Sequence, residues 1–255
     1  MSILDYLKIR PLERRKLVSV YSLLFKAYLN ELIKKSLPIH NIDELIQIKY
    51  DGIVWNVRRT NIMLDLSMIL LRHEATIKHW FVFKRDGVFV DAGAYLGSYS
   101  LRAAKSGSIV YAFEPNPQSF NILNKNANDN NLRIFLYNMA LWYKEEELEL
   151  TLDAGSSSIY HLEKFKPKIK IKSIPLDCLR LRHIDLMKVD VEGAEVEVLK
   201  GASSSLDVTD RIIIEVRNDT KNTVDELLRS HEFRLKGLDF TYPKSGIYNL
   251  FYEKK

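Results

Sequence analysis

A short apolar run that ends in an acid and a glycine-rich turn constrains the fold of this chain more than any other feature. Residues 88–90 (Val-Phe-Val) are typical of a strand buried on both faces. Asp91 follows, and Gly93 and Gly97 bound a tight turn before residues 98–106, which are predicted to be helical. A strand, a glycine turn and a helix N-terminus in this order typically form a nucleotide-binding corner of a parallel α/β sheet.

The spacing of the glycines differs from a dinucleotide-binding fingerprint. That fingerprint is G-x-G-x-x-G, but Tyr95 and Ser98 occupy the second and third glycine positions. A second apolar run ends at Glu114, 21 residues after Gly93, where a carboxylate typically reaches ribose hydroxyls. Because Asp91 suits a ligand with a cationic amine, the corner indicates S-adenosylmethionine. An ordinary glycine turn without a ligand is the alternative.

Segments typical of strands alternate with segments typical of helices along the chain. This alternation predicts an α/β fold with a mostly parallel sheet and helices on both faces. The expected strands are residues 46–50, 53–57, 88–90, 110–113, 133–137, 148–152, 168–174, 186–189, 211–216, 233–240 and 247–252. The expected helices are residues 65–81, 98–106, 118–128, 194–199, with Gly201 as a stop, and 224–230.

The net charge of +5 is concentrated in residues 1–40, which contain eight Lys or Arg and three Asp or Glu. Apolar residues recur at three- and four-residue steps between residues 3 and 36, which predicts one or two basic helices separated at Pro11. We therefore expect a basic helical extension, residues 1–40, and a main domain, residues 41–255. The helices could contact anionic lipid or a partner; packing on the core with a solvated basic face is the alternative that we favour.

Composition argues against several classes of protein. No apolar run approaches the roughly 18–20 residues of a membrane span, and the N-terminus lacks a signal-peptide pattern. A single cysteine, Cys178, excludes a disulfide framework and a cysteine zinc site. We expect a cytoplasmic protein, with membrane association at the cytoplasmic face only through residues 1–36. No pattern in the sequence indicates an oligomeric state.

Polar side chains follow the expected core strands, and four of the five strands end in an acid. Ligands of open α/β sheets bind beyond the carboxyl ends of the strands, so we expect these side chains around one site. They are Asp91, Glu114, Asn138, Asp190 with Glu192, and Glu215.

Lys188, Asp190 and Glu192 stand at alternate positions, so in an extended chain they would project from one face. Charges in such a place are costly unless they are paired or used. They could supply the acid–base groups for a hydroxyl nucleophile. For the lysine, an ion pair with Asp190 or Glu215 is the alternative. Asp190 and Glu192 would also suit magnesium, but the sequence names no third ligand.

These motifs resemble those of FkbM-type methyltransferases. The most specific match is the run IDLMKVDVEGAE, residues 184–195, and the resemblance covers roughly residues 70 to 235. The other matching segments are residues 88–97, 113–117, 138–141, 174–177, 198–202 and 213–216.

The resemblance implies a class I methyltransferase fold, which is Rossmann-like and doubly wound, with a mostly parallel seven-stranded sheet and here an N-terminal helical extension. It implies that residues 41–255 bind S-adenosylmethionine and transfer its methyl group, usually to a hydroxyl oxygen on a sugar or secondary metabolite. The cofactor-binding residues that we expect are Glu74, Asp91, Gly93, Tyr95, Gly97, Glu114, Asn116, Asn138, Ala140 and Asp190.

Carried over residue by residue, Asp91 would contact the methionine end of the cofactor and Glu114 the ribose, while Glu74 would close the pocket. Asp190 and Glu192 would face the methyl-transfer centre, and one of them is expected to remove the hydroxyl proton. Tyr95 departs from the family pattern, which often has a small or amide residue there.

We expect a small-molecule or glycan acceptor. Residues 41–255 carry no net charge, which argues against a nucleic-acid partner. Methylation of RNA or protein is an alternative, as is a non-catalytic cofactor-binding scaffold that acts through the N-terminal helices.

Overall fold

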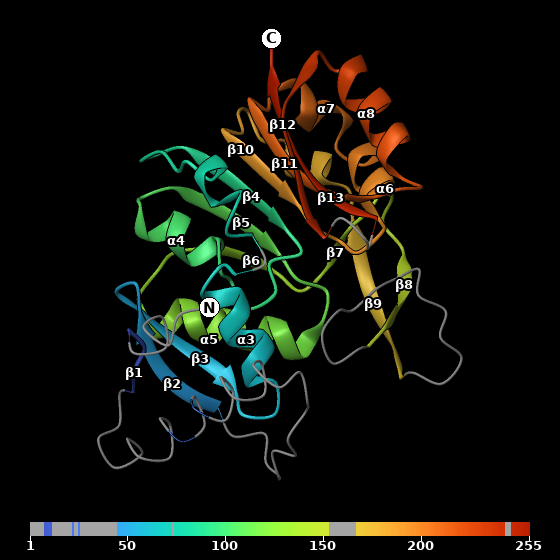
Figure 1. Cartoon of the computed structure of the whole chain (residues 1–255). Helices are drawn as coiled ribbons and strands as arrows, with labels where there is room; N and C mark the ends of the chain where they lie inside the picture. Colours follow the sequence, from blue (N-terminus) through green and yellow to red (C-terminus); the bar gives the residue numbers. More distant parts are fainter. Residues whose placement is uncertain are drawn as a thin grey trace.

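The computed structural model describes residues 8–11, 22, 25, 45–72, 74–152, 167–242 and 246–255, and its centre is a seven-stranded sheet (Figure 1). The strand order is β12-β13-β11-β10-β4-β5-β6; the five strands from β11 to β6 are parallel, and β13 is antiparallel to both neighbours. The predicted doubly wound, mostly parallel sheet is therefore confirmed. Its strands are β4 (Val88–Ala92), β5 (Ile109–Phe113), β6 (Phe135–Tyr137), β10 (Leu186–Val189), β11 (Arg211–Arg217), β12 (Phe233–Tyr242) and β13 (Ile247–Lys254).

Helices cover both faces of this sheet because alternate residues of its buried strands point to opposite sides. Val90, Met187 and Ile214 pack in one cluster with α6, α7 and α8. Phe89 and Ile213 pack in the other cluster with α4 and α5. These helices are α4 (Ser100–Lys105), α5 (Pro117–Asp129), α6 (Glu195–Lys200), α7 (Ser203–Asp207) and α8 (Lys221–Ser230).

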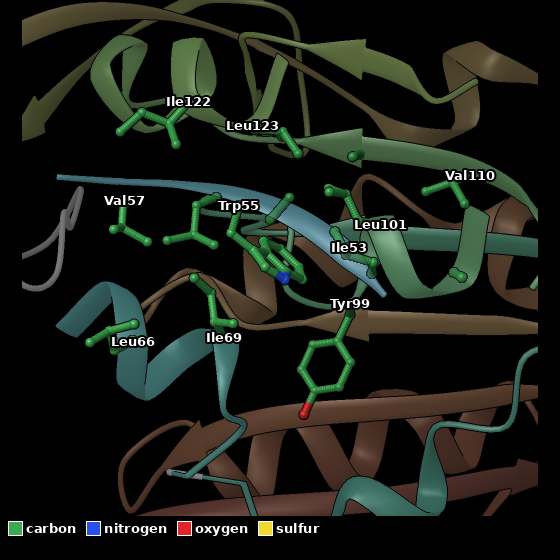
Figure 2. Packing of buried hydrophobic residues seen from close by; sticks show 14 of the residues in the cluster. Ile53, Trp55, Val57, Leu66, Ile69, Tyr99, Leu101, Val110, Ile122 and Leu123 are labelled. Carbon is green, nitrogen blue, oxygen red and sulfur yellow. The ribbon is translucent and has the colours of Figure 1, made fainter. Parts of the chain in front are cut away.

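A second, three-stranded sheet and helix α3 lie against α4 and α5 (Figures 1 and 2). Trp55 is fully buried at the centre of this contact. The strands predicted over residues 46–50 and 53–57 pair as an antiparallel hairpin, and Asp51 and Gly52 both have positive φ, as its tight two-residue turn requires. The elements are β1 (Arg10–Pro11), β2 (Leu45–Tyr50), β3 (Ile53–Arg58) and α3 (Ile62–Ile69).

Pro11, which the sequence places between two expected helices, lies in a short strand and not in a helix. Arg10 and Pro11 form β1, which pairs antiparallel with Lys49 and Ile48 of β2. Proline lacks an N–H to donate, so it is tolerated in an edge strand, and β1 is at the edge of its sheet. Apart from residues 8–11, 22 and 25, the predicted basic extension lies outside the described residues.

The helix expected over residues 65–81 is also different. Helix α3 ends at Ile69, and Leu71 has a φ of +51°, which a continuing helix does not allow. A 3₁₀ turn, η2 (Lys78–Trp80), follows, and Trp80 stacks on Phe251 of β13. The apolar residues after Ile69 therefore make tertiary contacts and do not continue the helix.

The strands predicted over residues 148–152 and 168–174 are present and belong to a three-stranded side sheet with strand order β7-β9-β8. Its strands are β7 (Ala140–Leu141), β8 (Glu147–Thr151) and β9 (Lys168–Ile174), followed by a 3₁₀ turn, η3 (Leu176–Leu179). The polar loop around residues 155–158 lies outside the described residues. Among the helices of the described segments, we find none that is both long and apolar enough to cross a membrane.

Gly201 is required for a reason other than a left-handed helix stop. Its φ is −82°, which any residue adopts. A Cβ at this position would lie 1.9 Å from the carbonyl oxygen of Trp142, which immediately follows β7. The glycine therefore permits the end of α6 to approach the backbone of the side sheet.

We expect Gly201→Ala to lower the free energy of unfolding by about 2–3 kcal/mol, because the added methyl group must push backbone atoms apart. Urea denaturation measures this loss. The matched control is Lys200→Ala, which alters the exposed neighbouring residue and is expected to change stability by about 0.5 kcal/mol or less. Equal stability of the Gly201→Ala variant and the wild type would contradict the close contact.

Candidate functional site

A cavity of about 1120 Å³, part of it open to solvent, lies beyond the carboxyl ends of β4, β5 and β10. The chain order of the sheet reverses between β4 and β10, which is where open α/β sheets bind ligands. Nine of the expected site residues line this cavity. They are Glu74, Asp91, Gly93, Tyr95, Glu114, Asn116, Ala140, Asp190 and Glu192.

Two of the expected cofactor-binding residues are absent from the lining of the described cavity and instead hold the loops beside it. Gly97 has a φ of +93°, and a Cβ there would lie 2.3 Å from Leu101 Cδ1, so this glycine allows the turn to pack on α4. Asn138 donates from Nδ2 to the carbonyl oxygen of Glu114 at 2.8 Å and holds the loop after β5.

Asp91 is buried in β4 with one carboxylate oxygen satisfied and the other not. Oδ2 accepts a hydrogen bond from Ser100 Oγ at 2.6 Å. Oδ1 has no hydrogen-bond donor within the described part of the chain, and Lys188 Nζ lies 3.7 Å away. Burial raises the pKa of Asp91 and outweighs the opposing effect of Lys188. An unsatisfied buried acceptor that lines a cavity is a fitting contact for an ammonium group.

The turn after β4 requires glycine at Gly93. Its φ is +80°, and a Cβ would lie 1.8 Å from the carbonyl oxygen of Asp190. The N–H groups of Gly93 and Ala94 both donate to the carbonyl oxygen of Phe113 at 3.0 Å. The loops after β4, β5 and β10 are therefore held in direct backbone contact at the mouth of the cavity.

Glu114 follows β5, and two backbone N–H groups fix its carboxylate. Tyr95 N–H donates to Oε2 at 2.7 Å, and Asn116 N–H donates to Oε1 at 2.9 Å. Burial raises the pKa of Glu114 to about 7, although both hydrogen bonds oppose the rise. The side chain is held in one orientation, with the remaining lone pairs available to hydroxyl donors of a ligand.

Lys188 is buried, and its ammonium group lies between carboxylates. Nζ is 3.2 Å from Asp190 Oδ2 and 3.4 Å from the Gly93 carbonyl oxygen. Burial lowers the pKa of Lys188, but attraction to Asp190, Asp91 and Glu74 outweighs it and leaves the pKa above its usual value. Lys188 is therefore a charged partner and not a base, and the predicted ion pair is formed with Asp190.

Glu74 was expected on a helix but lies in a turn after α3. Its carboxylate accepts a hydrogen bond from Tyr99 Oη at 2.5 Å. Burial raises the pKa of Glu74 to about 7, and the nearby charge of Lys188 opposes this rise. Glu74 thus lines the cavity as a group that can gain a proton near neutral pH.

The expectation that Lys188, Asp190 and Glu192 share one extended face is wrong for Glu192. Strand β10 ends at Val189, and Glu192 has a φ of +55°, so the chain has already turned. Glu192 nevertheless lines the cavity, where Oε2 accepts a hydrogen bond from Arg217 Nη2 at 3.0 Å.

Glu215 of β11 joins Asp190 and Glu192 in a cluster whose carboxylate oxygens lie within 4.8 Å of one another. Burial raises the pKa of Glu215 to about 9, and repulsion from Asp190 and Glu192 adds to this rise. The cluster supplies the third carboxylate that the sequence pattern lacked for magnesium. Magnesium binding itself stays a prediction.

Sequence reasoning missed several lining residues because they come from segments without a motif. Ser98 and Ser119 stand near the starts of helices that follow core strands, a position that could have indicated them. The others depend on the packing of the second sheet and the side sheet. The missed residues include Arg58, Met68, Ser98, Ser119 and Leu150.

The pKa of Glu74 predicts a pH-dependent stability. Its folded-state pKa of about 7 lies above the ordinary value of 4.5, so the folded state holds more protons between these values. The wild type should therefore lose stability as pH rises from about 4.5 to 7, by about 3 kcal/mol from this group. Urea denaturation of the wild type and Glu74→Gln at pH 5 and pH 8 measures the effect.

We expect the stability of Glu74→Gln relative to the wild type to improve between pH 5 and pH 8. The control is Glu149→Gln, which makes the same change at an exposed carboxylate of β8. A constant difference for Glu74→Gln would contradict the assignment of a raised pKa to Glu74.

Comparison with known proteins agrees with this geometry. The model of the "Methyltransferase FkbM domain" matches residues 91–235 of the chain. The hexuronic acid methyltransferase AglP of Haloferax volcanii is 25% identical over 167 residues, which cover 64% of this chain and 66% of AglP. The chain therefore spans just under two thirds of the length of AglP.

Two further comparisons concern a fungal relative and a solved structure. Methyltransferase 1 of Beauveria bassiana is 27% identical over 183 residues, with 59% of this chain and 74% of that protein covered. The crystal structure of Trm5b from Pyrococcus abyssi has a TM-score of 0.51 at 13% identity, covering 84% of this chain and 56% of Trm5b, and shows a shared fold. Since the domain model matches more than half of its residues, the chain belongs to the FkbM methyltransferase family.

Proposed function

We propose that the protein transfers the methyl group of S-adenosylmethionine to a hydroxyl group of a sugar, a glycan or a related small metabolite. The observation that carries this proposal is the pair of buried carboxylates, Asp91 and Glu114, at the point where the strand order reverses. One presents an unsatisfied oxygen beside the glycine turn, and the other is held by two backbone N–H groups.

The residues fit this cofactor at both ends. Asp91 Oδ1 would accept a hydrogen bond from the amino group of the methionine moiety, and Glu114 would accept hydrogen bonds from ribose hydroxyls. Met139 and Ala140 would border the adenine, and they line the cavity next to Phe113. Bound here, S-adenosylmethionine supplies an electrophilic methyl group on a positively charged sulfur.

The protein has two tasks in methyl transfer, alignment and proton removal. Alignment of oxygen, methyl carbon and sulfur accounts for most of the catalysis that the chain must provide. As the acceptor oxygen forms its bond to the methyl carbon, the carbon–sulfur bond breaks and the hydroxyl proton passes to a carboxylate of the protein. We assign this base role to Asp190 or Glu192, both of which line the cavity.

A sugar acceptor is supported by the relative AglP, which is described as a hexuronic acid methyltransferase. The balanced charge of residues 41–255 disfavours RNA, and the likeness to Trm5b concerns the fold alone. We further propose that residues 1–40, of which Arg10 and Pro11 pair with β2, form a basic extension that packs on the main domain and leaves its charged face in solvent.

Calorimetric titration with S-adenosylmethionine, S-adenosylhomocysteine and NAD tests the proposed cofactor. We expect micromolar binding of S-adenosylmethionine and S-adenosylhomocysteine, weakened by about tenfold or more in Asp91→Ala and Glu114→Ala because each loses charge-assisted hydrogen bonds. Glu149→Ala removes an exposed carboxylate of β8 and should bind both ligands as the wild type does. Binding of NAD alone, or of none of the three, would overturn the proposed cofactor.

Single-turnover methyl transfer from labelled S-adenosylmethionine to a panel of neutral sugars and hexuronic acids tests the base. Asp190→Asn and Glu192→Gln preserve size but cannot accept the proton. We expect one of them to lower the rate by about 100-fold or more and the other by less than about tenfold. If both variants keep more than about a tenth of the wild-type rate, neither carboxylate is the base.

A further inference from the structure

Tyr95, the residue that departs from the family pattern, connects the cofactor-binding turn to the second sheet. Its φ is +53°, in the left-handed region that favours glycine. Its hydroxyl group donates to Asp65 Oδ1 at 2.8 Å and accepts a hydrogen bond from Arg58 Nη2. The guanidinium of Arg58 also lies over the Tyr95 ring, 5.0 Å from its centroid.

Asp65 makes this connection rigid. It is completely buried in the first turn of α3 and accepts hydrogen bonds from the backbone N–H, Nε and Nη2 of Arg58 at 2.8, 3.1 and 2.6 Å. Arg58 is the last residue of β3, so the carboxylate joins the end of β3 to the start of α3. The Tyr95 hydroxyl therefore contacts two groups that are already fixed to each other.

The backbone of Tyr95 carries the connection into the site. Its N–H donates to Glu114 Oε2, one of the two hydrogen bonds that orient this carboxylate. The direction of that N–H depends on the left-handed conformation of Tyr95. Because a non-glycine residue persists in such a conformation only where its surroundings enforce it, the contacts of the side chain and the position of the N–H are linked.

We propose that Arg58, Asp65 and Tyr95 form a positioning unit through which the second sheet orients Glu114 and so sets the affinity for the adenosine part of the cofactor. The unit acts through Glu114, and none of its three members takes part in methyl transfer. This inference rests on the proposed cofactor. It gives the second sheet, which lies outside the seven-stranded sheet, a direct effect on ligand binding.

The test variant is Tyr95→Phe, which keeps the ring over Arg58 and loses only the hydroxyl hydrogen bonds. The matched control is Tyr252→Phe, because the buried Tyr252 also donates to an aspartate, Asp225, at 2.8 Å, but far from the cavity lining. Calorimetry with S-adenosylhomocysteine and with adenosine gives dissociation constants, and methyl-transfer kinetics separate KM from kcat.

We expect Tyr95→Phe to weaken the binding of S-adenosylhomocysteine and adenosine by the same factor, about fivefold, with kcat at saturating cofactor within about twofold of the wild type. Tyr252→Phe should leave both dissociation constants unchanged. A purely structural role of Tyr95 would instead give the two tyrosine variants the same binding behaviour, and that result would overturn the proposal.

A double-mutant cycle with Glu114→Gln shows whether the effect passes through Glu114. In that background Tyr95→Phe should change the dissociation constant by less than about twofold, measured with ligand up to millimolar concentrations. The same factor in both backgrounds, or wild-type affinity in Tyr95→Phe, would overturn the positioning role alone. Failure of the wild type to bind S-adenosylhomocysteine would overturn the proposed cofactor, and the positioning role with it.

Discussion

The site depends on one buried cation. Lys188 places its ammonium group between Asp91 of β4 and Asp190 after β10, and Glu74, in the turn after α3, adds a third carboxyl group nearby. Burial raises the pKa of Asp91 and of Glu74, and this ammonium group opposes the rise at both carboxyl groups. Because Lys188 is paired on several sides, it keeps its charge and bridges the carboxylates of Asp91 and Asp190.

The second sheet completes the site from the opposite side. Its hairpin is fixed to the main domain by buried amides, since Asn126 of α5 accepts hydrogen bonds from the backbone and side-chain N–H groups of Asn56 and donates to the carbonyl oxygen of Leu96. Leu96 lies in the glycine turn itself. The same turn is therefore linked to β3 and α5 by hydrogen bonds. It also packs in the hydrophobic cluster that contains Trp55.

Sequence patterns predicted the central strands and their order of appearance because buried parallel strands leave a strong local signal, such as the run RIIIEVR in β11. The carboxylates at the strand ends were predicted for the same reason. Contacts between distant segments were not: Arg58 and Met68 line the cavity only because the hairpin and α3 pack against it. Glu74 lies in a turn that begins at Leu71, and Glu192 lies in the turn after β10. Leu71 and Glu192 both have positive φ, and the periodicity of the sequence predicts neither turn.

The contact between Gly93 and the carbonyl oxygen of Asp190 has a consequence for redesign of the enzyme. The turn that faces the cofactor and the loop that carries the candidate base touch backbone to backbone, so neither can move without the other. A loop grafted from a relative to alter acceptor choice would need its donor's partner turn as well. For the purpose of redesign, the two loops form one unit, and exchanging both together preserves their backbone contact.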